Sequence, residues 1–251
     1  MGGNEIGGQE DRAMIGYYKI ADRLVRIESL YPKIHKYCHG YEASPADAEA
    51  PVDIDVKILT SDIEREKKDD EDFPDSYWEL LAVHRKLSTA MLDFDTFLFH
   101  GSCVAVDGEA FLFTAPSGTG KSTHARLWKK YLGEKVIMVN DDKPFIRVDD
   151  SGVFVYGTPF NGKHRLATDI CVPLKAVCLL SRGETNEISR VSQKEAYPSL
   201  IKQTYRPETT EQLAKTMALL DRLTFSVELY TLSCNMDVDA ARVAYEGMHG
   251  K

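Results

Sequence analysis

The segment Ala115–Thr123, which reads Ala-Pro-Ser-Gly-Thr-Gly-Lys-Ser-Thr, constrains the fold of this chain more than any other stretch. It follows the β-prone run Ala110–Thr114 and precedes the helix-forming run His124–Leu132. The segment matches the pattern Gly-x-x-x-x-Gly-Lys-Ser/Thr, with Ala115 in place of the first glycine. Because glycine allows dihedral angles that side chains forbid, the sequence predicts a tight loop that joins a strand to a helix.

A loop of this form is suited to binding phosphate. Its backbone N–H groups converge into an anion-binding nest, and the positive end of the following helix adds to the attraction. Lys121 supplies a point charge for the β and γ phosphates, while the hydroxyl of Ser122 can ligate Mg²⁺. The alternative is an ordinary glycine-rich turn, which the strand before the loop and the helix after it disfavour. We therefore expect ATP and Mg²⁺ as cofactors, bound by Ser117, Gly118, Thr119, Gly120, Lys121, Ser122 and Thr123.

Two adjacent carboxylates, Asp141 and Asp142, follow the apolar run Val136–Asn140. An aspartate at a strand end beside a phosphate loop is expected to serve the metal ion, and a second carboxylate often orients the nucleophile. One of the two can then accept the proton of an attacking hydroxyl, and their mutual repulsion tends to raise one pKa. The sequence leaves open which aspartate has which role. A solvated turn is the alternative, as at Asp149-Asp150, but that pair follows a less apolar stretch.

The remaining patterns predict an α/β fold with a mixed, hairpin-rich sheet. Asp107-Gly108 lies between the β-prone runs Phe97–Val106 and Ala110–Thr114, which is a strong hairpin signal. A second hairpin is expected around Asp149–Gly152. Helical periodicity predicts helices over Tyr77–Leu92, Gln193–Tyr205, Thr209–Thr224 and Val238–His249. We expect a flexible tail at residues 1–12, an N-terminal α+β portion at 13–94 and a P-loop core at 95–251.

Composition narrows the class of partner and the compartment. The formal net charge of −8 argues against nucleic acid, because binding to the phosphate backbone requires a positive surface. No apolar stretch approaches the ~20 residues that a membrane span requires, and the first residues do not resemble a signal peptide. The five cysteines are irregularly spaced, which argues against a disulfide framework. We therefore expect a cytoplasmic protein with neither a nucleic-acid nor a membrane partner.

The order of these motifs resembles the catalytic core of bacterial HPr kinase/phosphorylase. The matching residues are Phe99-His100-Gly101-Ser102, the hairpin that follows them, the loop Pro116–Ser122 and the strand that ends at Asn140-Asp141-Asp142. The same stretch is similar to ATP-dependent phosphoenolpyruvate carboxykinase, whose loop contains Ser-Gly-Thr-Gly-Lys-Thr-Thr and is followed later by Asp-Asp. The resemblance covers roughly Phe97–Phe160 and implies a P-loop fold with His100 beside the phosphate site. Since the HPr kinase family forms oligomers, it also raises the expectation of a homo-oligomer.

The chain departs from both families in several respects. Thr123 stands where HPr kinase has Glu, and the later segment that is associated with phosphorolysis in that family is not recognisable. The chain is also far shorter than a carboxykinase. The best match is therefore an ATP- and Mg²⁺-dependent kinase that phosphorylates a hydroxyl group of a small molecule, or a Ser/Thr of a peptide or protein. The alternatives are a nucleotide-sensing binding protein without transfer chemistry and a carboxykinase-like lyase.

The resulting assignment of residues is specific. Catalytic roles fall to Asp141, Asp142, Lys121 and His100, and metal ligation to Ser122, Asp141 and Asp142. The loop Thr158–Arg165 can place Lys163 or Arg165 against the transferred phosphate, because such a transition state needs cationic clamps. A charged surface loop is the alternative for these two residues.

Overall fold

The computed structural model describes residues 13–47, 50–162 and 164–249. The chain divides between Leu87 and Ser88 into two compact units, and this division falls within helix α3, Asp75–Ala90. The unit after the division contains the glycine-rich loop and the paired aspartates. Each unit is therefore described by itself.

The N-terminal unit is built on a three-stranded sheet in the order β1-β2-β3. Strands β1 and β2 are antiparallel and are joined at Ala21 and Asp22, which both adopt a positive φ. Strand β3 runs parallel to β2. The elements are β1 Met14–Ile20, β2 Arg23–Ser29, α1 Lys33–Tyr37, β3 Ile54–Lys57, α2 Thr60–Glu66 and most of α3.

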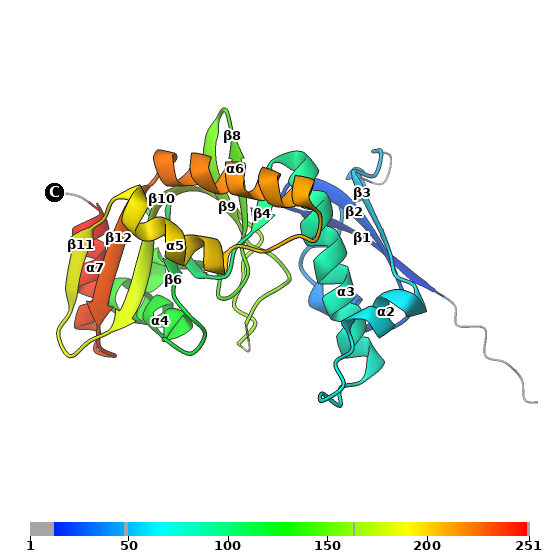
Figure 1. Ribbon diagram of the computed structural model, residues 1–251, viewed down its shortest axis with the longest axis horizontal. Coiled ribbons are helices and arrows are strands. Elements are labelled where there is room, and N and C mark those ends of the chain that lie inside the picture. The colour runs from blue at the N-terminus through cyan, green and yellow to red at the C-terminus, as the bar shows by residue number, and fades with distance from the viewer. Residues whose placement is uncertain (1–12, 48–49, 163, 250–251) are drawn as a thin grey trace, which may run out of the picture. The chain divides into compact units, whose positions relative to one another are not determined.

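The second unit is a mixed α/β structure around a curled mixed sheet (Figure 1). Its strands are β4 Thr96–Leu98, β5 Ser102–Val106, β6 Glu109–Thr114, β7 Ile137–Asn140, β8 Phe145–Asp149, β9 Gly152–Tyr156, β10 Cys171–Arg182, β11 Glu187–Arg190 and β12 Glu228–Cys234. Its helices are α4 Lys121–Leu132, α5 Gln193–Gln203, α6 Thr210–Ser226 and α7 Asp239–His249, with short 3-10 turns η2 Met91–Phe94 and η3 Gly133–Lys135. The expected α/β class with a mixed sheet is confirmed at this level.

Strand β10 connects two parts of the sheet because it is long enough to pair differently at its two ends. Its first residues pair with β9, which continues to β8 and β4. Its later residues lie between β6 and β12 and run parallel to both. The order across the second part is β7-β5-β6-β10-β12-β11.

The strand directions bring four strand ends to one edge of the sheet. Strands β6, β10 and β12 are mutually parallel, and β5 is antiparallel to both β6 and β7. Strand β7 therefore runs in the same direction as β6. The segments that follow β7, β6, β10 and β12 consequently emerge at the same edge, where loops commonly form ligand sites.

Both faces of the sheet are covered, so alternate residues of each strand are buried on opposite sides. Val104, Phe111 and Phe113 pack in a cluster with residues of α4 and α7. Cys103 and Leu112, their chain neighbours, pack instead in a cluster with residues of α5 and α6. In Figure 1 these two helix pairs flank the strands. The resulting rigid layer fixes the positions of the loops at the edge.

The hairpin between β5 and β6 bears on the tight turn and on the strand that the sequence predicts before it. Asp107 and Gly108 adopt φ of 52° and 84°, so the predicted tight turn between β5 and β6 is confirmed. The single run Phe97–Val106 was wrong as one strand, because His100-Gly101 separates β4 from β5. Strand β4 pairs with β8, whereas β5 pairs with β6 and β7. The break places His100 between two parts of the sheet.

The helices and the cysteines bear on the expectations about membrane spans and disulfides. None of the helices formed by the described residues has the length and apolar character needed to cross a membrane. Cys38, Cys103, Cys178 and Cys234 are free thiols.

Candidate functional site

The loop between β6 and α4 has the backbone that its glycines predict. Gly118 and Gly120 adopt φ of +77° and +124°, in the region that side chains rarely enter. A Cβ built at either position would meet nothing within 4 Å. Glycine is therefore needed at these positions for its positive φ and not for lack of room, and open space remains beside the loop. Gly120 directly precedes α4, and the first N–H groups of a helix point toward whatever lies in front of it.

Ala115 is compatible with the loop even though the general motif has glycine there. Its backbone does not adopt a positive φ, so alanine introduces no strain. Its side chain is buried, and its carbonyl oxygen accepts a hydrogen bond of 3.0 Å from Nζ of Lys121. The formal departure from the motif therefore has no structural cost at this position.

Lys121 is enclosed by the loop, with only 7% of its surface exposed. Burial lowers the pKa of its ammonium group, although the negative charge of Asp142 acts in the opposite direction. A buried cation with one carbonyl partner has two further N–H donors to offer. This arrangement suits an anionic group placed in the loop.

Asp141 lies directly after β7 and is buried against the loop that follows β9. Its Oδ1 accepts a 2.6 Å hydrogen bond from the backbone N–H of Gly162. Its Oδ2 is buried and has no hydrogen-bond partner. Burial raises the pKa of this carboxyl group, the Gly162 hydrogen bond opposes the rise, and the charge of Asp142 adds to it. Among the described residues, no Lys or Arg side chain forms an ion pair with Asp141 to compensate for the burial of its charge, and His164 opposes the rise in its pKa only as the smallest of the causes.

The carbonyl oxygen of Asp141 also organises two hydroxyl groups. It accepts hydrogen bonds from Oγ of Ser102 at 2.8 Å and from Oγ of Ser122 at 3.1 Å. Because each serine uses its proton on this carbonyl, the lone pairs of Ser122 Oγ remain available to a cation. Ser122 and Asp141 are therefore brought together as predicted.

Asp142 belongs to a second set of contacts. Its Oδ1 lies 3.4 Å from Nε2 of His100, and its Oδ2 lies 3.7 Å from Nζ of Lys143. Burial alone would raise the pKa of Asp142, but the hydrogen bond with His100 and the charges of Lys143 and Lys121 outweigh it and lower the pKa. Adjacent aspartates thus have pKa values shifted in opposite directions.

His100 is held in place by Gln203, at the end of α5. The amide oxygen Oε1 of Gln203 can only accept, so Nδ1 of His100 donates the 2.7 Å hydrogen bond between them. The backbone N–H of His100 also donates to the carbonyl oxygen of Gln203. These two contacts orient the ring so that Nε2 faces Oδ1 of Asp142.

The loop Thr158–Arg165 reaches the site through the N–H of Gly162, where a Cβ would lie 2.9 Å from Oδ2 of Asp141. Arg165 is exposed and has a positive φ of 51°. Lys163 lies outside the described residues. Thr158 is buried, and its Oγ1 accepts a hydrogen bond from the Asn140 amide that also fixes the backbone before Asp142.

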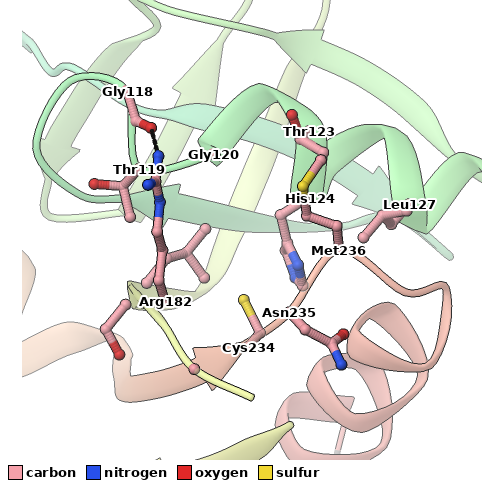
Figure 2. A pocket seen from close by; sticks show the side chains of 13 residues that line it. Gly118, Thr119, Gly120, Thr123, His124, Leu127, Arg182, Cys234, Asn235 and Met236 are labelled. Carbon is pink, nitrogen blue, oxygen red and sulfur yellow. Dashed lines mark hydrogen bonds between the residues drawn. The ribbon is translucent and has the colours of Figure 1, made fainter. Parts of the chain in front are cut away.

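A cavity of about 450 Å³ opens on the other side of the loop (Figure 2). Gly118, Thr119 and Gly120 form one wall, and the first turns of α4 form another. The remaining lining comes from the ends of β10 and β12, where Arg182 donates a 2.6 Å hydrogen bond to the carbonyl oxygen of Gly118. The loop therefore lies between this cavity and the paired aspartates, since β10 and β12 lie on one side of β6, and β7 on the other.

Several contributors to the site were not predicted. Gln203 lies 103 residues from His100 in sequence, and Gly162 donates to Asp141 through its backbone, which no residue-type pattern reports. Ser102 was noted only as part of the His100 motif. The ends of β10 and β12 carried no motif at all, although the apolar strand before Arg182 was a signal that it emerges at a sheet edge.

The residues present fit a magnesium ion better than a metal held by protein alone. Within the described parts of the chain, no cluster of three or more His, Cys, Asp or Glu side chains is arranged to hold a metal ion. Magnesium commonly takes only one or two protein ligands, always favouring oxygen, and completes its shell with phosphate and water. The unpartnered Oδ2 of Asp141 and the lone pairs of the Ser122 hydroxyl are oxygen donors of the kind that such an ion takes.

Replacing Asp141 by Asn should raise the thermal stability of the protein at neutral pH in the absence of Mg²⁺. The pKa of Asp141 is raised in the folded state, so this group stabilises the fold only when protonated, and that contribution is lost as pH rises through the folded pKa. An amide avoids this loss. Thermal unfolding at pH 7 measures this gain in stability. The melting temperature should rise by about 2–4 °C for each kcal/mol recovered.

The difference in melting temperature between wild type and the Asp141→Asn protein should shrink as pH falls toward the ordinary aspartate pKa of 3.8. Asp150→Asn is the matched control, because Asp150 is fully exposed in the turn after β8. A lower melting temperature for the Asp141→Asn protein at pH 7 would contradict the uncompensated burial of this carboxylate.

The chain matches a protein family and resembles solved structures. The family described as SynChlorMet cassette protein ScmC matches residues 59–236. No curated protein matches the chain significantly. Among solved structures, the chain is similar to the Hpr(Ser) kinase/phosphatase from Coxiella burnetii, with 12% identity and a TM-score of 0.29. That match covers 51% of this chain and 97% of the other chain. A TM-score this low does not establish a shared fold.

Proposed function

This chain belongs to the ScmC family of SynChlorMet cassette proteins, and we propose that it is a kinase that transfers the γ-phosphoryl group of ATP to a hydroxyl group in the presence of Mg²⁺. The observation that carries the proposal is the order of features along one edge of the sheet. The cavity, the glycine-rich loop and the paired aspartates follow one another there. A nucleoside, its phosphates and a metal with an acceptor would occupy them in that order.

The loop would bind the phosphates through its own backbone and through Lys121. Ser117–Gly120 precede the N-terminus of α4, whose N–H groups and dipole favour negative charge. Lys121 exchanges its hydrogen bond with the carbonyl of Ala115 for phosphate oxygens. The hydroxyl of Thr123, on the cavity side, is placed to contact the phosphate nearest the nucleoside. Arg182, which is tied to the carbonyl of Gly118, adds a positive charge at the same loop.

Ser122 and Asp141 would hold Mg²⁺, which supplies charge neutralisation for the β and γ phosphate oxygens when bound. Oδ2 of Asp141 gains the cation that its burial requires, and Ser122 keeps its proton on the Asp141 carbonyl while offering a lone pair. Asp142 follows directly and stays close enough to contribute through water. These assignments give the two aspartates separate roles.

Asp142 would orient and deprotonate the acceptor hydroxyl. Its lowered pKa keeps it ionised, so it can accept a hydrogen bond from the acceptor hydroxyl and orient it, although the same shift makes it a weaker base. In the transfer, the acceptor oxygen forms a bond to the γ phosphorus, the bond from phosphorus to the bridging oxygen of ADP breaks, and the hydroxyl proton passes to Asp142. His100, held by Gln203, keeps the carboxylate in position and offers positive charge near the transferred group.

The acceptor is proposed to be a hydroxyl of a small molecule or a Ser/Thr side chain of a peptide or protein. Arg165 remains a proposed clamp for the transferred phosphate, together with Lys163. The proposal is tested by incubating the protein with γ-labelled ATP, Mg²⁺ and a cell extract, followed by mass spectrometry of the labelled products. A labelled phosphate ester that requires Asp142 is the expected result.

Other products would contradict the proposal. ATP binding without any labelled product other than inorganic phosphate would favour a nucleotide-sensing protein. Formation of phosphoenolpyruvate from oxaloacetate and ATP would favour a carboxykinase-like lyase instead. Asp150→Asn serves as the control in each assay, because this exposed carboxylate lies outside the site.

A further inference from the structure

A buried histidine, His124, lies in the wall of the cavity beside the loop. It occupies the first turn of α4, is only 2% exposed and packs edge-on against Phe113. In Figure 2 its ring extends from α4 toward Cys234 and Asn235, at the end of β12. The roles assigned so far do not use this side chain. Its hydrogen bonding shows what it offers to the cavity.

The position of the proton on His124 follows from its neighbour Trp128. The indole N–H of Trp128 lies 3.1 Å from Nε2 of His124. Because an indole nitrogen can only donate, Nε2 must accept, and the proton of the neutral ring sits on Nδ1. Burial lowers the pKa of His124 to about 4, so the ring stays neutral at physiological pH. His124 is thus a single, fixed N–H donor.

That donor has no acceptor. Nδ1 of His124 is buried and lacks a hydrogen-bond partner. An unpaired buried N–H is unfavourable, so such groups usually have a partner in the functional state. Asn235, a polar neighbour in the lining, is already engaged, since its amide donates to the carbonyl of Glu184 and to Asp237. The cavity therefore presents an unused donor on its α4 side.

We propose that Nδ1–H of His124 recognises the base of the bound nucleotide by donating a hydrogen bond to a ring nitrogen of adenine. The inference rests on the proposed function, because that function places a nucleoside in this cavity. Adenine carries three unprotonated ring nitrogens on its edges, N1, N3 and N7, and each is an acceptor. The phosphates would lie on the loop at Gly118–Gly120, and His124 lies in the first turn of the helix that follows, in the wall of the same cavity.

Access to Nδ1 requires a small rearrangement. The atom is covered by its neighbours, so a base reaches it only after a lining side chain has moved. Met236 belongs to the same lining and is 76% exposed. Its unbranched side chain can change rotamer at low cost. We expect a rotamer change in this lining to give the base access to Nδ1 of His124.

The test compares ligands that contain or lack the base. Isothermal titration in the presence of Mg²⁺ measures the affinity of wild type, His124→Phe and His124→Asn for ATP and for inorganic tripolyphosphate. Phe keeps the ring packing but removes the donor, whereas the amide N–H of Asn can take the place of Nδ1–H. We expect His124→Phe to weaken ATP binding about tenfold, the size of one lost hydrogen bond, while tripolyphosphate binding changes less than about twofold. Asn should recover most of the loss.

Deaza analogues identify the acceptor and keep the test independent of how the variants fold. Wild type is titrated with 1-deaza-, 3-deaza- and 7-deaza-ATP. One analogue should bind about tenfold more weakly than ATP to wild type, yet bind His124→Phe as well as ATP does. Equal binding of ATP and all three analogues to wild type would overturn the base contact.

The remaining outcomes separate this inference from the proposed function. Equal ATP affinity in wild type and His124→Phe, with tripolyphosphate still bound, would overturn the base contact and leave the phosphate site standing. Failure of wild type to bind either ATP or tripolyphosphate would overturn the proposed function and this inference together.

Discussion

Replacing Asp142 by Asn is expected to reduce phosphoryl transfer by about 10²–10⁴-fold, the contribution typical of a general base. The substitution is isosteric, and the backbone at this position is held independently, because the Asp142 N–H donates to Oδ1 of Asn140. An amide oxygen can still accept from Nε2 of His100. The fold and the phosphate loop should therefore persist while the proton acceptor is lost.

The measurement separates binding from chemistry. Titration should give an affinity for ATP within about threefold of wild type, because the substitution removes no phosphate contact. A tenfold change in affinity would correspond to about 1.4 kcal/mol. Initial rates of product formation should fall by the full factor. Asp150→Asn, from the pair Asp149-Asp150, should leave both quantities unchanged because its exposed ion pair with Arg222 contributes little. Undiminished turnover in Asp142→Asn would remove this residue from the chemistry.

Replacing Gly157 by Ala should destabilise the protein by about 3 kcal/mol or more, through overpacking of backbone against backbone. A Cβ at Gly157 would collide with the carbonyl oxygen of Thr168 and lie 2.8 Å from that of Val139. Both neighbours are fixed, since Gly157 donates to the Ile170 carbonyl and Thr168 donates to the Val139 carbonyl. Relief requires the segment after β9 to separate from the end of β7, which also carries Asp141.

Denaturant unfolding of Gly157→Ala and Gly108→Ala distinguishes collision from backbone strain. Gly108 has a φ of +84° and open space around it, so alanine there costs only conformational strain of about 1–2 kcal/mol. Gly157 has no such φ but has no room. A loss in Gly157→Ala equal to or below that in Gly108→Ala would contradict the close crossing of these segments.

Local signals in the sequence predicted the parts of the fold that depend on neighbouring residues. The turn at Asp107-Gly108 forms because two consecutive residues tolerate a positive φ, and this preference is readable from residue type. The helix after the loop likewise ends at Gly133, which adopts a φ of +64°. Helix α4 begins earlier than expected, at Lys121, because the N–H groups of the loop lead directly into its first turn.

Pairings between distant segments were not predictable in the same way. Strand β10 lies between β6 and β12, which are separated from it by tens of residues, and no alternation within one strand specifies its neighbours. The part of the cavity wall formed by the ends of β10 and β12 therefore had no sequence signal, whereas the loop and α4 that complete it were predicted. Similarly, Gln203 contacts His100 because the segment after α5 pairs with the end of β4, as the bridge between Phe99 and Thr204 shows.

The paired aspartates illustrate how the structure sharpens a sequence prediction. The sequence predicts that two adjacent carboxylates differ in pKa but cannot say which is raised. Burial with an unpartnered oxygen raises the pKa of Asp141, whereas His100 and two lysines lower that of Asp142. Lys143 follows Asp142 directly, whereas His100 and Lys121 lie far from it in sequence and are brought close by the fold. The assignment of Asp141 to the metal and Asp142 to the acceptor follows from those contacts and remains a proposal.

The phosphate loop is tested most directly by titrating ATP with Mg²⁺ into wild type and Lys121→Ala. Lys121 is the buried cation of the loop, and removing a charged hydrogen-bond donor to phosphate should weaken binding by about 10–100-fold. Lys130→Ala, an exposed lysine of the same helix, is the matched control and should bind as wild type does. Equal affinity of wild type and Lys121→Ala for ATP, or no binding by wild type, would contradict the proposal that this loop binds the phosphates of ATP.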